Sequence, residues 1–251
     1  MGRYIREFRW IIAAIFVASI LSGQVPAQQP SQPHVDKFKL HETIQPVSQA
    51  ELQQAIARAN SDGAQAFLIE MDTPGGMVES MRAMVAAELA SRVPVIVYVA
   101  PSGSRAGSAG FFLLEAADIA AMAPGTEAGA AHVVYEFGKP DATLQQKIEN
   151  DAEAFLRSFV TRRNRNTEAA AAALQNSRSY TAEEALNQHL IDLIKNNENE
   201  LLAALDGREI TRFDGSKVTL HVAALASRHF VLRCAMNCLA GWSIPISRCC
   251  S

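Results

Sequence analysis

The chain has 251 residues, of which 49% are hydrophobic and 20% charged, and its formal net charge is −3. This is the balance of an ordinary globular protein, so a disordered chain, a collagen and a coiled coil are excluded. The slight negative charge gives no sign of a surface for nucleic-acid phosphates, and we expect no nucleic-acid partner.

The first 27 residues have the pattern of a secretory signal peptide. Arginines at positions 3, 6 and 9 precede a mostly apolar run at 10–21, and small residues follow up to Ala27. The run is shorter than the about 20 residues of a spanning helix, although an uncleaved anchor is the alternative. In both cases we expect an exported protein on the periplasmic or extracytoplasmic side of the membrane, associated with that membrane. Residues 28–34 form a polar linker.

From residue 35 onward, strand-like and helix-like patterns alternate. Short apolar runs predict strands at 35–41, 66–71, 93–100 and 119–122. Apolar spacings of three or four predict helices at 48–60, 78–91, 108–117, 144–162 and 167–175, and another beginning at Thr181. Ser48 with Glu51, and Thr181 with Glu184, fit capping boxes. This order predicts an α/β fold with a parallel sheet, right-handed crossovers and flanking helices.

The end of the chain has a different character. Residues 201–227 form an extension in which Asp214 and Gly215 favour a short hairpin. All four cysteines lie within an atypical tail at 228–251, and the spacing of His229, Cys234 and Cys238 matches no common zinc pattern. The chain also has no P-loop, no dinucleotide fingerprint and no HExxH, so we expect neither a metal nor a cofactor.

Two glycine-rich loops follow predicted strands. They are DTPGG at 72–76 and SGSRAGSAG at 102–110. Because the carboxyl ends of parallel strands share one edge of the sheet, both loops should present free N–H groups to the same cleft. Two N–H donors that converge from separate loops are what an oxyanion hole requires.

Ser108 is the candidate nucleophile. It lies among small residues at a predicted helix start, where a substrate carbonyl could approach closely. The same position also suits a helix N-cap, and the residues alone leave both interpretations open. Ser102 and Ser104 are more typical of polar groups in a loop.

A nucleophilic serine needs a base, and the sequence offers three candidates. Lys147 falls on the flank of the apolar face of its helix, where burial would favour the free amine that a lysine base requires, although a solvated surface lysine fits as well. His132 follows a glycine-containing turn and could be a base or a structural residue that lines the substrate. Lys139 lies beside Pro140 in a polar loop, where we expect it to be solvated.

These motifs together resemble the NfeD-type membrane-bound serine proteases of the ClpP/crotonase superfamily. The resemblance is carried by EMDTPGGMVES, by VPVIVYVAPSGSRAGSAG and by AMAPGTEAGAAH within 69–133, and it extends more loosely over 35–193. It implies a ClpP/crotonase-like fold, with a serine protease domain at 35–200. Full-length members continue into membrane helices and an OB-type domain, which the tail here does not resemble, so we expect a member that lacks them.

The resemblance also implies the roles of individual residues. The SAG element makes Ser108 the nucleophile, and KIENDA fits the family's lysine segment at Lys147. The oxyanion donors would be the N–H groups of Gly76 and Ala109. In ClpP the base is a histidine, so His132 remains the alternative base.

These features predict a serine endopeptidase that cleaves hydrophobic segments of membrane-associated proteins, including stomatin-like partners, as a homodimer or larger assembly. One alternative is a catalytically silent partner of a stomatin-like scaffold that only binds peptides. Another is a crotonase-like acyl-thioester enzyme, although export removes it from cytosolic coenzyme A thioesters.

Overall fold

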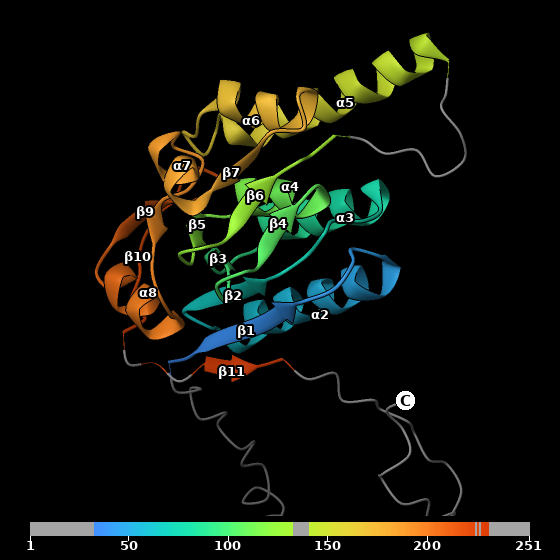
Figure 1. Ribbon diagram of the computed structural model, residues 1–251. Coiled ribbons are helices and arrows are strands. Elements are labelled where there is room, and N and C mark those ends of the chain that lie inside the picture. The colour runs from blue at the N-terminus through green and yellow to red at the C-terminus, as the bar shows by residue number, and fades with distance from the viewer. Residues whose placement is uncertain (1–32, 133–140, 224, 226, 231–251) are drawn as a thin grey trace, which may run out of the picture. The chain divides into compact units, whose positions relative to one another are not determined.

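The computed structural model describes residues 33–132, 141–223, 225 and 227–230 (Figure 1). The chain divides into two units, Met1–Gln32 and Pro33–Ser251, and only the second contains described residues. The predicted signal peptide, most of the predicted linker, Lys139 and the four cysteines lie outside the described residues.

The centre of the fold is a parallel sheet of six strands in the order β11-β1-β2-β3-β5-β8 (Figure 1). Its strands are β1 (Val35–Leu40), β2 (Ala66–Met71), β3 (Val95–Val99), β5 (Ile119–Met122), β8 (Leu193–Ile194) and β11 (Ser227–His229). The helices are α2 (Pro46–Asp62), α3 (Val78–Leu89), α4 (Ala109–Ala116), α5 (Ala142–Val160), α6 (Thr167–Gln175), α7 (Ala182–Asn187) and α8 (Glu198–Leu205). The predicted α/β class is therefore confirmed.

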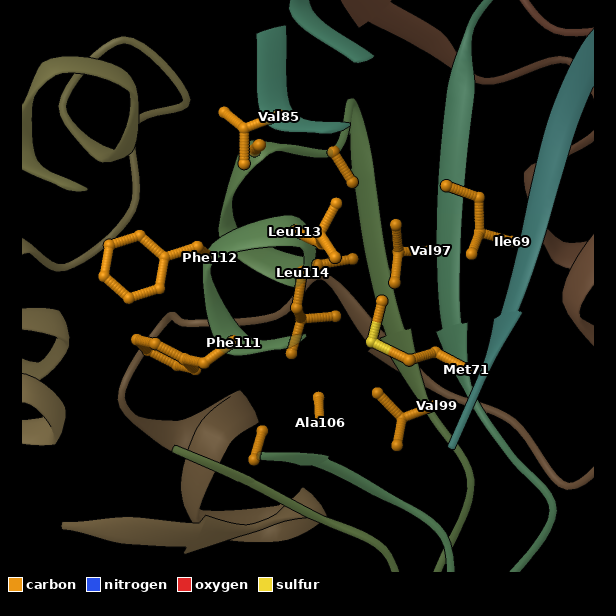
Figure 2. Close-up of a cluster of buried hydrophobic side chains, with 14 of the residues drawn as sticks. Ile69, Met71, Val85, Val97, Val99, Ala106, Phe111, Phe112, Leu113 and Leu114 are labelled. Carbon is orange, nitrogen blue, oxygen red and sulfur yellow. The ribbon is translucent and has the colours of Figure 1, made fainter. Parts of the chain in front are cut away.

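Both faces of the sheet are covered, so its central strands are mostly apolar, although β2 also contains Glu70. In β2, Phe67 and Ile69 belong to the larger core, which α2, α3, α4, α5 and α6 complete, whereas Ala66 and Leu68 belong to a smaller core under α8. Figure 2 shows the larger core at α4, where Leu114 faces the sheet. Burying a side chain of this size contributes about 1.5–3 kcal/mol.

A second, smaller sheet supports the loops at the carboxyl edge of the large one. It contains β4 (Arg105–Gly107), β6 (Glu127–Gly129) and β7 (Ser179–Thr181), with β4 parallel and β7 antiparallel to β6. An isolated bridge joins Thr73, from the first glycine-rich loop, to Ala106 of β4. The two loops predicted to share a cleft are thus joined by backbone pairing.

One predicted helix start is wrong. The helix begins at Pro46 rather than at Ser48, because Pro46 occupies the first turn, where its missing N–H costs nothing. The hydroxyl of Ser48 instead accepts a hydrogen bond from the N–H of Gln45, the N-cap residue, at 3.0 Å. Glu51 is therefore not the partner of a capping box.

Other predictions near the end of the chain are confirmed, and the short strands β4, β6, β7 and β8 were not predicted. Thr181 and Glu184 form the predicted capping box, and β9 (Glu209–Thr211) pairs with β10 (Lys217–Thr219) in the predicted hairpin. The sequence analysis did not predict α8. It also did not predict β11, which lies beside β1 at the sheet edge (Figure 1).

Candidate active site

Ser108 lies in a sharp turn between β4 and α4. Its backbone has φ 49° and ψ −113°, a strained conformation for a residue with a side chain. Its N–H donates to the Gly129 carbonyl at 2.8 Å. Ser108 occupies the N-cap position of α4, yet its side chain makes no capping hydrogen bond. Within the described residues its hydroxyl has no hydrogen-bond partner, so capping does not account for the serine.

The turn is packed tightly against the first glycine-rich loop. A Cβ on Gly75 would lie 2.5 Å from the Ser108 Cβ, and a Cβ on Gly107 would lie 3.1 Å from the Pro74 carbonyl oxygen. A Cβ on Gly110 would lie 2.5 Å from Cγ2 of Thr73. These glycines therefore let the two backbones touch, and they fix where the Ser108 side chain begins.

Two backbone N–H groups beside Ser108 lack acceptors among the described residues. The neighbours of Gly76 are used, since the Gly75 carbonyl accepts from Ile44 N–H at 2.8 Å and Met77 N–H donates to the Ile44 carbonyl at 2.9 Å. The N–H of Gly76 itself is left over. Ala109 is the first residue of α4, and an N–H in the first turn of a helix has no partner within that helix.

Ser108, Gly76 and Ala109 border the same cavity, which has a volume of ≈ 440 Å³. Its remaining walls are mostly apolar and come from α3, α4, α5 and the loops: Thr43, Pro74, Met77, Val78, Met81, Arg82, Phe112, Ala130, Ala131 and Ala152. Three of the five predicted site residues therefore border one cavity, and its volume is typical of ligand pockets.

A second cavity of ≈ 80 Å³ also touches Ser108. It lies over the small sheet and is bordered by Pro74, Arg105, Gly107, Ser108, Glu127, Ala128, Gly129, Ala130 and Ser179. Ser108 thus borders both the larger and the smaller cavity.

Lys147 does not border either of these cavities. It is exposed on α5, in a stretch from Ala142 to Asp151 without a buried side chain, and its amine pairs with no described residue. One turn further along, Asp151 forms an ion pair with Arg82, and Ala152 reaches the larger cavity. The role of Lys147 as a base stays a prediction.

His132 also lies outside the walls of both cavities, although its neighbours Ala130 and Ala131 border the larger one. Its Nδ1 is 3.4 Å from the Leu174 carbonyl oxygen, and its Nε2 is 3.9 Å from Oε1 of Glu149. The imidazole is therefore engaged by α5 and α6.

Arg82 is a residue of the site that the sequence analysis missed. Its guanidinium lies 4.3 Å from the centre of the Phe155 ring on α5, and that ring stacks on Phe112 at 6.3 Å. Together with the pair to Asp151, these contacts join α3, α4 and α5 at the rim of the larger cavity. The signal available in the sequence was weak, because a single arginine within an amphipathic helix is usually a solvated residue.

Two fully buried carboxyl groups lie on α3 and α4, the helices that border the site, but not in the walls of either cavity. Glu88 on α3 and Glu115 on α4 have no hydrogen-bond partner for either side-chain oxygen among the described residues. Burial raises the pKa of Glu115 to about 8, against the attraction of Arg165, and it raises the pKa of Glu88 well above its usual range. With a pKa of about 8, Glu115 is therefore mostly protonated at neutral pH.

One group of side chains has the composition of a metal site. His34, Asp36 and Asp62 offer ligand atoms within 4.8 Å of one another. Arg228 occupies this group: its Nε lies 3.2 Å from Asp36, its Nη2 lies 3.3 Å from Asp62, and it also contacts His34. The guanidinium supplies the positive charge that a metal ion would otherwise provide.

The fold and the tight turn at Ser108 define an α/β protein of the ClpP type. The catalytic domain of the ClpP protease from Plasmodium falciparum shares this fold, with a TM-score of 0.52 at 14% identity, over 64% of this chain and 86% of that chain. A sequence model of the family described as NfeD1b, N-terminal domain, matches residues 34–206. The chain belongs to this family, as its motifs predicted.

Two curated relatives have related sequences. The chain is 33% identical to the membrane-bound protease PH1510 of Pyrococcus horikoshii over 177 residues, which are 69% of this chain and 40% of that protein. It is 29% identical to the membrane protein NfeD1b of Bacillus subtilis over 162 residues, which are 64% of this chain and 36% of that protein. The chain therefore spans less than half the length of these relatives.

A solved structure extends the likeness to three dimensions. It is a serine-to-alanine variant of the 1510-N membrane-bound stomatin-specific protease, with a TM-score of 0.73 at 30% identity, over 80% of this chain and 99% of that chain. A lysine-to-alanine variant of that protease, solved with a substrate peptide, matches with the same TM-score. Among the residues described here, no helix has the length and apolar character needed to span a membrane.

Proposed function

We propose that the chain is a serine endopeptidase that cleaves hydrophobic peptide segments of membrane-associated proteins, including stomatin-like ones. One observation carries the proposal: the uncapped hydroxyl of Ser108 is held in a strained turn on the wall of an apolar cavity that two unused N–H groups also border. A substrate carbonyl beside Ser108 Oγ could receive both donors, which is the arrangement that stabilises a tetrahedral oxyanion.

The reaction assigns one role to each group. Lys147, as the free amine, takes the proton of the Ser108 hydroxyl while Oγ forms a bond to the substrate carbonyl carbon. The N–H groups of Gly76 and Ala109 hold the oxygen that becomes negative. The C–N bond then breaks, and the leaving amine takes the proton from Lys147. Water next attacks the ester, and the Ser108 hydroxyl is restored.

The place of Lys147 on α5 supports this assignment. Lys147 lies four residues before Asp151, about 6 Å along the helix from the residue that pairs with Arg82 at the cavity rim. A lysine side chain is long enough to extend from that turn toward the rim. The base would act when a bound peptide or a second subunit covers the exposed half of α5, Ala142–Asp151. We therefore propose that the chain forms a homodimer or a larger assembly.

Replacement of Ser108 tests the nucleophile. Ser108→Ala should abolish cleavage of a hydrophobic peptide and labelling by a serine-reactive phosphonate. Ser102→Ala is the matched control, because Ser102 is an exposed serine of the same loop that borders neither cavity. Undiminished turnover of Ser108→Ala would overturn the proposal.

The identity of the base can be tested separately. In the wild type, the rate of phosphonate labelling should increase as the pH rises into the alkaline range. In Lys147→Met, the rate should fall nearly to zero at every pH. If labelling survives in Lys147→Met with an inflection near pH 6.5, the usual histidine value, and is lost in His132→Ala, then His132 is the base.

A second function is favoured by the finding that Lys147 and His132, the two base candidates among the described residues, do not border the Ser108 cavities. The chain would then be a catalytically silent partner of a stomatin-like scaffold and would use the larger cavity only to bind an extended apolar peptide. A wild-type protein that binds such peptides but is never labelled by the phosphonate would support this function over the peptidase.

The cellular site of action follows from the residues before the fold. We propose that the protein is exported and acts at the extracytoplasmic face of a membrane, because 1–27 have the pattern of a signal peptide or anchor. Fractionation of cells that produce the full chain, followed by N-terminal sequencing, tests both the location and the cleavage after Ala27.

A further inference from the structure

We infer that the two cavities at Ser108 are subsites for the two residues joined by the cleaved bond, a bulky apolar residue on the acyl side and a small residue such as glycine, alanine or serine on the amine side. The inference rests on the proposed peptidase function and adds the choice of bond. It requires that the cavities meet at the nucleophile. Pro74, Ser108 and Ala130 do border both of them, so a chain that passes over Ser108 enters one from the other.

The sizes of the two cavities select different side chains. An apolar cavity of about 150 Å³ holds one benzene molecule. The larger cavity, at ≈ 440 Å³, can therefore take an aromatic or branched aliphatic side chain, and its walls include Met81 and Phe112. The smaller cavity, at ≈ 80 Å³, is too small for a ring and suits a hydrogen atom, a methyl group or a hydroxymethyl group.

The free N–H groups determine which side of the bond lies in which cavity. Gly76 and Ala109 border the larger cavity and not the smaller one. The carbonyl oxygen that becomes the oxyanion belongs to the residue on the acyl side, and it must reach both donors. The side chain of the acyl-side residue therefore lies in the large apolar cavity, and the residue on the amine side of the cleaved bond lies in the small cavity.

Part of the wall of the small cavity is held in place by backbone pairing. Gly107 on β4 is paired with Gly129 on β6, and Gly129 is paired in turn with Ser179 on β7. A Cβ on Gly129 would lie 2.3 Å from the Arg178 carbonyl oxygen. Backbone pairing therefore fixes this part of the wall, and the exposed side chains of Arg105 and Glu127 complete it. Because the paired part cannot shift, the cavity should favour a small residue.

Ser179 is a residue whose side chain can alter the small cavity without a change in the proposed catalytic groups. It borders the small cavity only and is exposed. The matched residue on the other side is Met77, which is 48% exposed and borders the large cavity only. Variants at these two positions can therefore change one subsite at a time.

The experiment compares two hydrophobic peptides that differ at one residue, with leucine on the acyl side and either alanine or leucine on the amine side. Mass spectrometry of the products identifies the bond that is cut. We expect kcat/KM to favour the alanine peptide at least about tenfold, the scale on which pockets discriminate by size. Ser179→Gly should reduce this ratio. Met77→Ala should weaken selection for leucine on the acyl side and leave the alanine-to-leucine ratio unchanged.

The outcomes separate the subsite assignment from the function on which it rests. Cleavage that depends on Ser108 but shows an equal or reversed preference on the amine side overturns the assignment alone. A preference for alanine that is unchanged in Ser179→Gly and lost in Met77→Ala also overturns it, because the small residue would then bind elsewhere. If no peptide is cleaved in a Ser108-dependent manner, both the function and the assignment fail.

Discussion

Gly75 lies directly against Ser108, so closely that a Cβ on Gly75 would stand 2.5 Å from the Cβ of the serine. Gly75 also has φ 109°, which a residue with a side chain rarely adopts. The first glycine-rich loop therefore packs against the proposed nucleophile, and it also offers the N–H of Gly76.

Gly75→Ala should move Ser108 and abolish most of the activity. We expect at least a hundredfold loss of kcat/KM, because a misplacement of about 1 Å can have an effect of this size. The measurements are peptide cleavage and thermal unfolding. Gly103→Ala is the control, since Gly103 has φ 94° in the second loop but no atom within 4 Å of an added Cβ. Equal losses of activity in the two variants would contradict the role of close packing.

The carboxyl of Glu115 should make stability fall as the pH rises. Its pKa is about 8 in the folded protein and near the ordinary value of 4.5 in the unfolded chain. Between these values only the folded state holds the proton, so each pH unit lowers the free energy of unfolding by up to roughly 1.4 kcal/mol, and the loss levels off above pH 8.

Glu115→Gln removes this titration. Compared with the wild type, the variant should gain stability steadily from pH 5 to pH 8, as measured by urea unfolding at several pH values. Glu79→Gln, on the exposed part of α3, should give a curve parallel to that of the wild type. A parallel curve for Glu115→Gln would show that the carboxyl is not kept protonated.

The contacts of Arg82 should hold α5 in place at the rim of the larger cavity. Arg82→Met removes both the ion pair with Asp151 and the contact with the Phe155 ring. We expect the rate of phosphonate labelling to fall about tenfold or more, with a loss of stability near 1 kcal/mol because the groups are partly exposed.

The matched control for Arg82→Met is Arg58→Met, which breaks an exposed ion pair with Asp62 on α2. It should leave labelling unchanged. Asp151→Asn should have a smaller effect than Arg82→Met, since the stacking on Phe155 remains. If Arg82→Met is labelled at the wild-type rate, the ion pair and the stacking do not position α5 for the reaction.

Asp118 should be among the most important polar side chains for stability. It is buried, and its carboxylate accepts hydrogen bonds from Arg163 at 2.6 Å, from Arg212 at 3.1 Å and from the N–H of Val95 at 2.8 Å. Asp118→Ala leaves the buried guanidinium groups of Arg163 and Arg212 with backbone carbonyl partners but without a carboxylate, which should cost about 3–5 kcal/mol in the free energy of unfolding.

Chemical unfolding measures this cost. Glu209→Ala is the comparison, because the Glu209–Lys217 ion pair of 2.8 Å is exposed and should contribute less than about 1 kcal/mol. A similar small change for Asp118→Ala would show that solvent reaches Asp118 when its partners are lost.

Sequence reasoning located the elements whose signals are local. The apolar runs and spacings predicted four strands of the large sheet, and the two glycine-rich loops do meet at Ser108, with Gly76 and Ala109 beside it. The parallel order of the sheet brings these loops together, so a local pattern was sufficient.

The features that sequence reasoning missed depend on contacts between distant segments. β11 has three residues, and it becomes a strand only because β1 offers a free edge. The small cavity depends on the pairing of β6 with β7, about 50 residues further along the chain. The exposed half of α5 carries an apolar pattern at Leu144 and Ile148 that suggested burial of Lys147, yet no described segment covers it.

The direction of β1 and β11 determines how the folded unit can be tethered. Both strands run parallel to β2, whose carboxyl end leads into the loop beside Ser108. An attachment upstream of Val35 therefore joins the sheet at the edge opposite to the proposed nucleophile, about 20 Å away along the six residues of β1. β11 ends at His229, which pairs with Lys37 in the first half of β1, so a fusion placed after Phe230 would leave the sheet before it reaches the edge where the nucleophile lies.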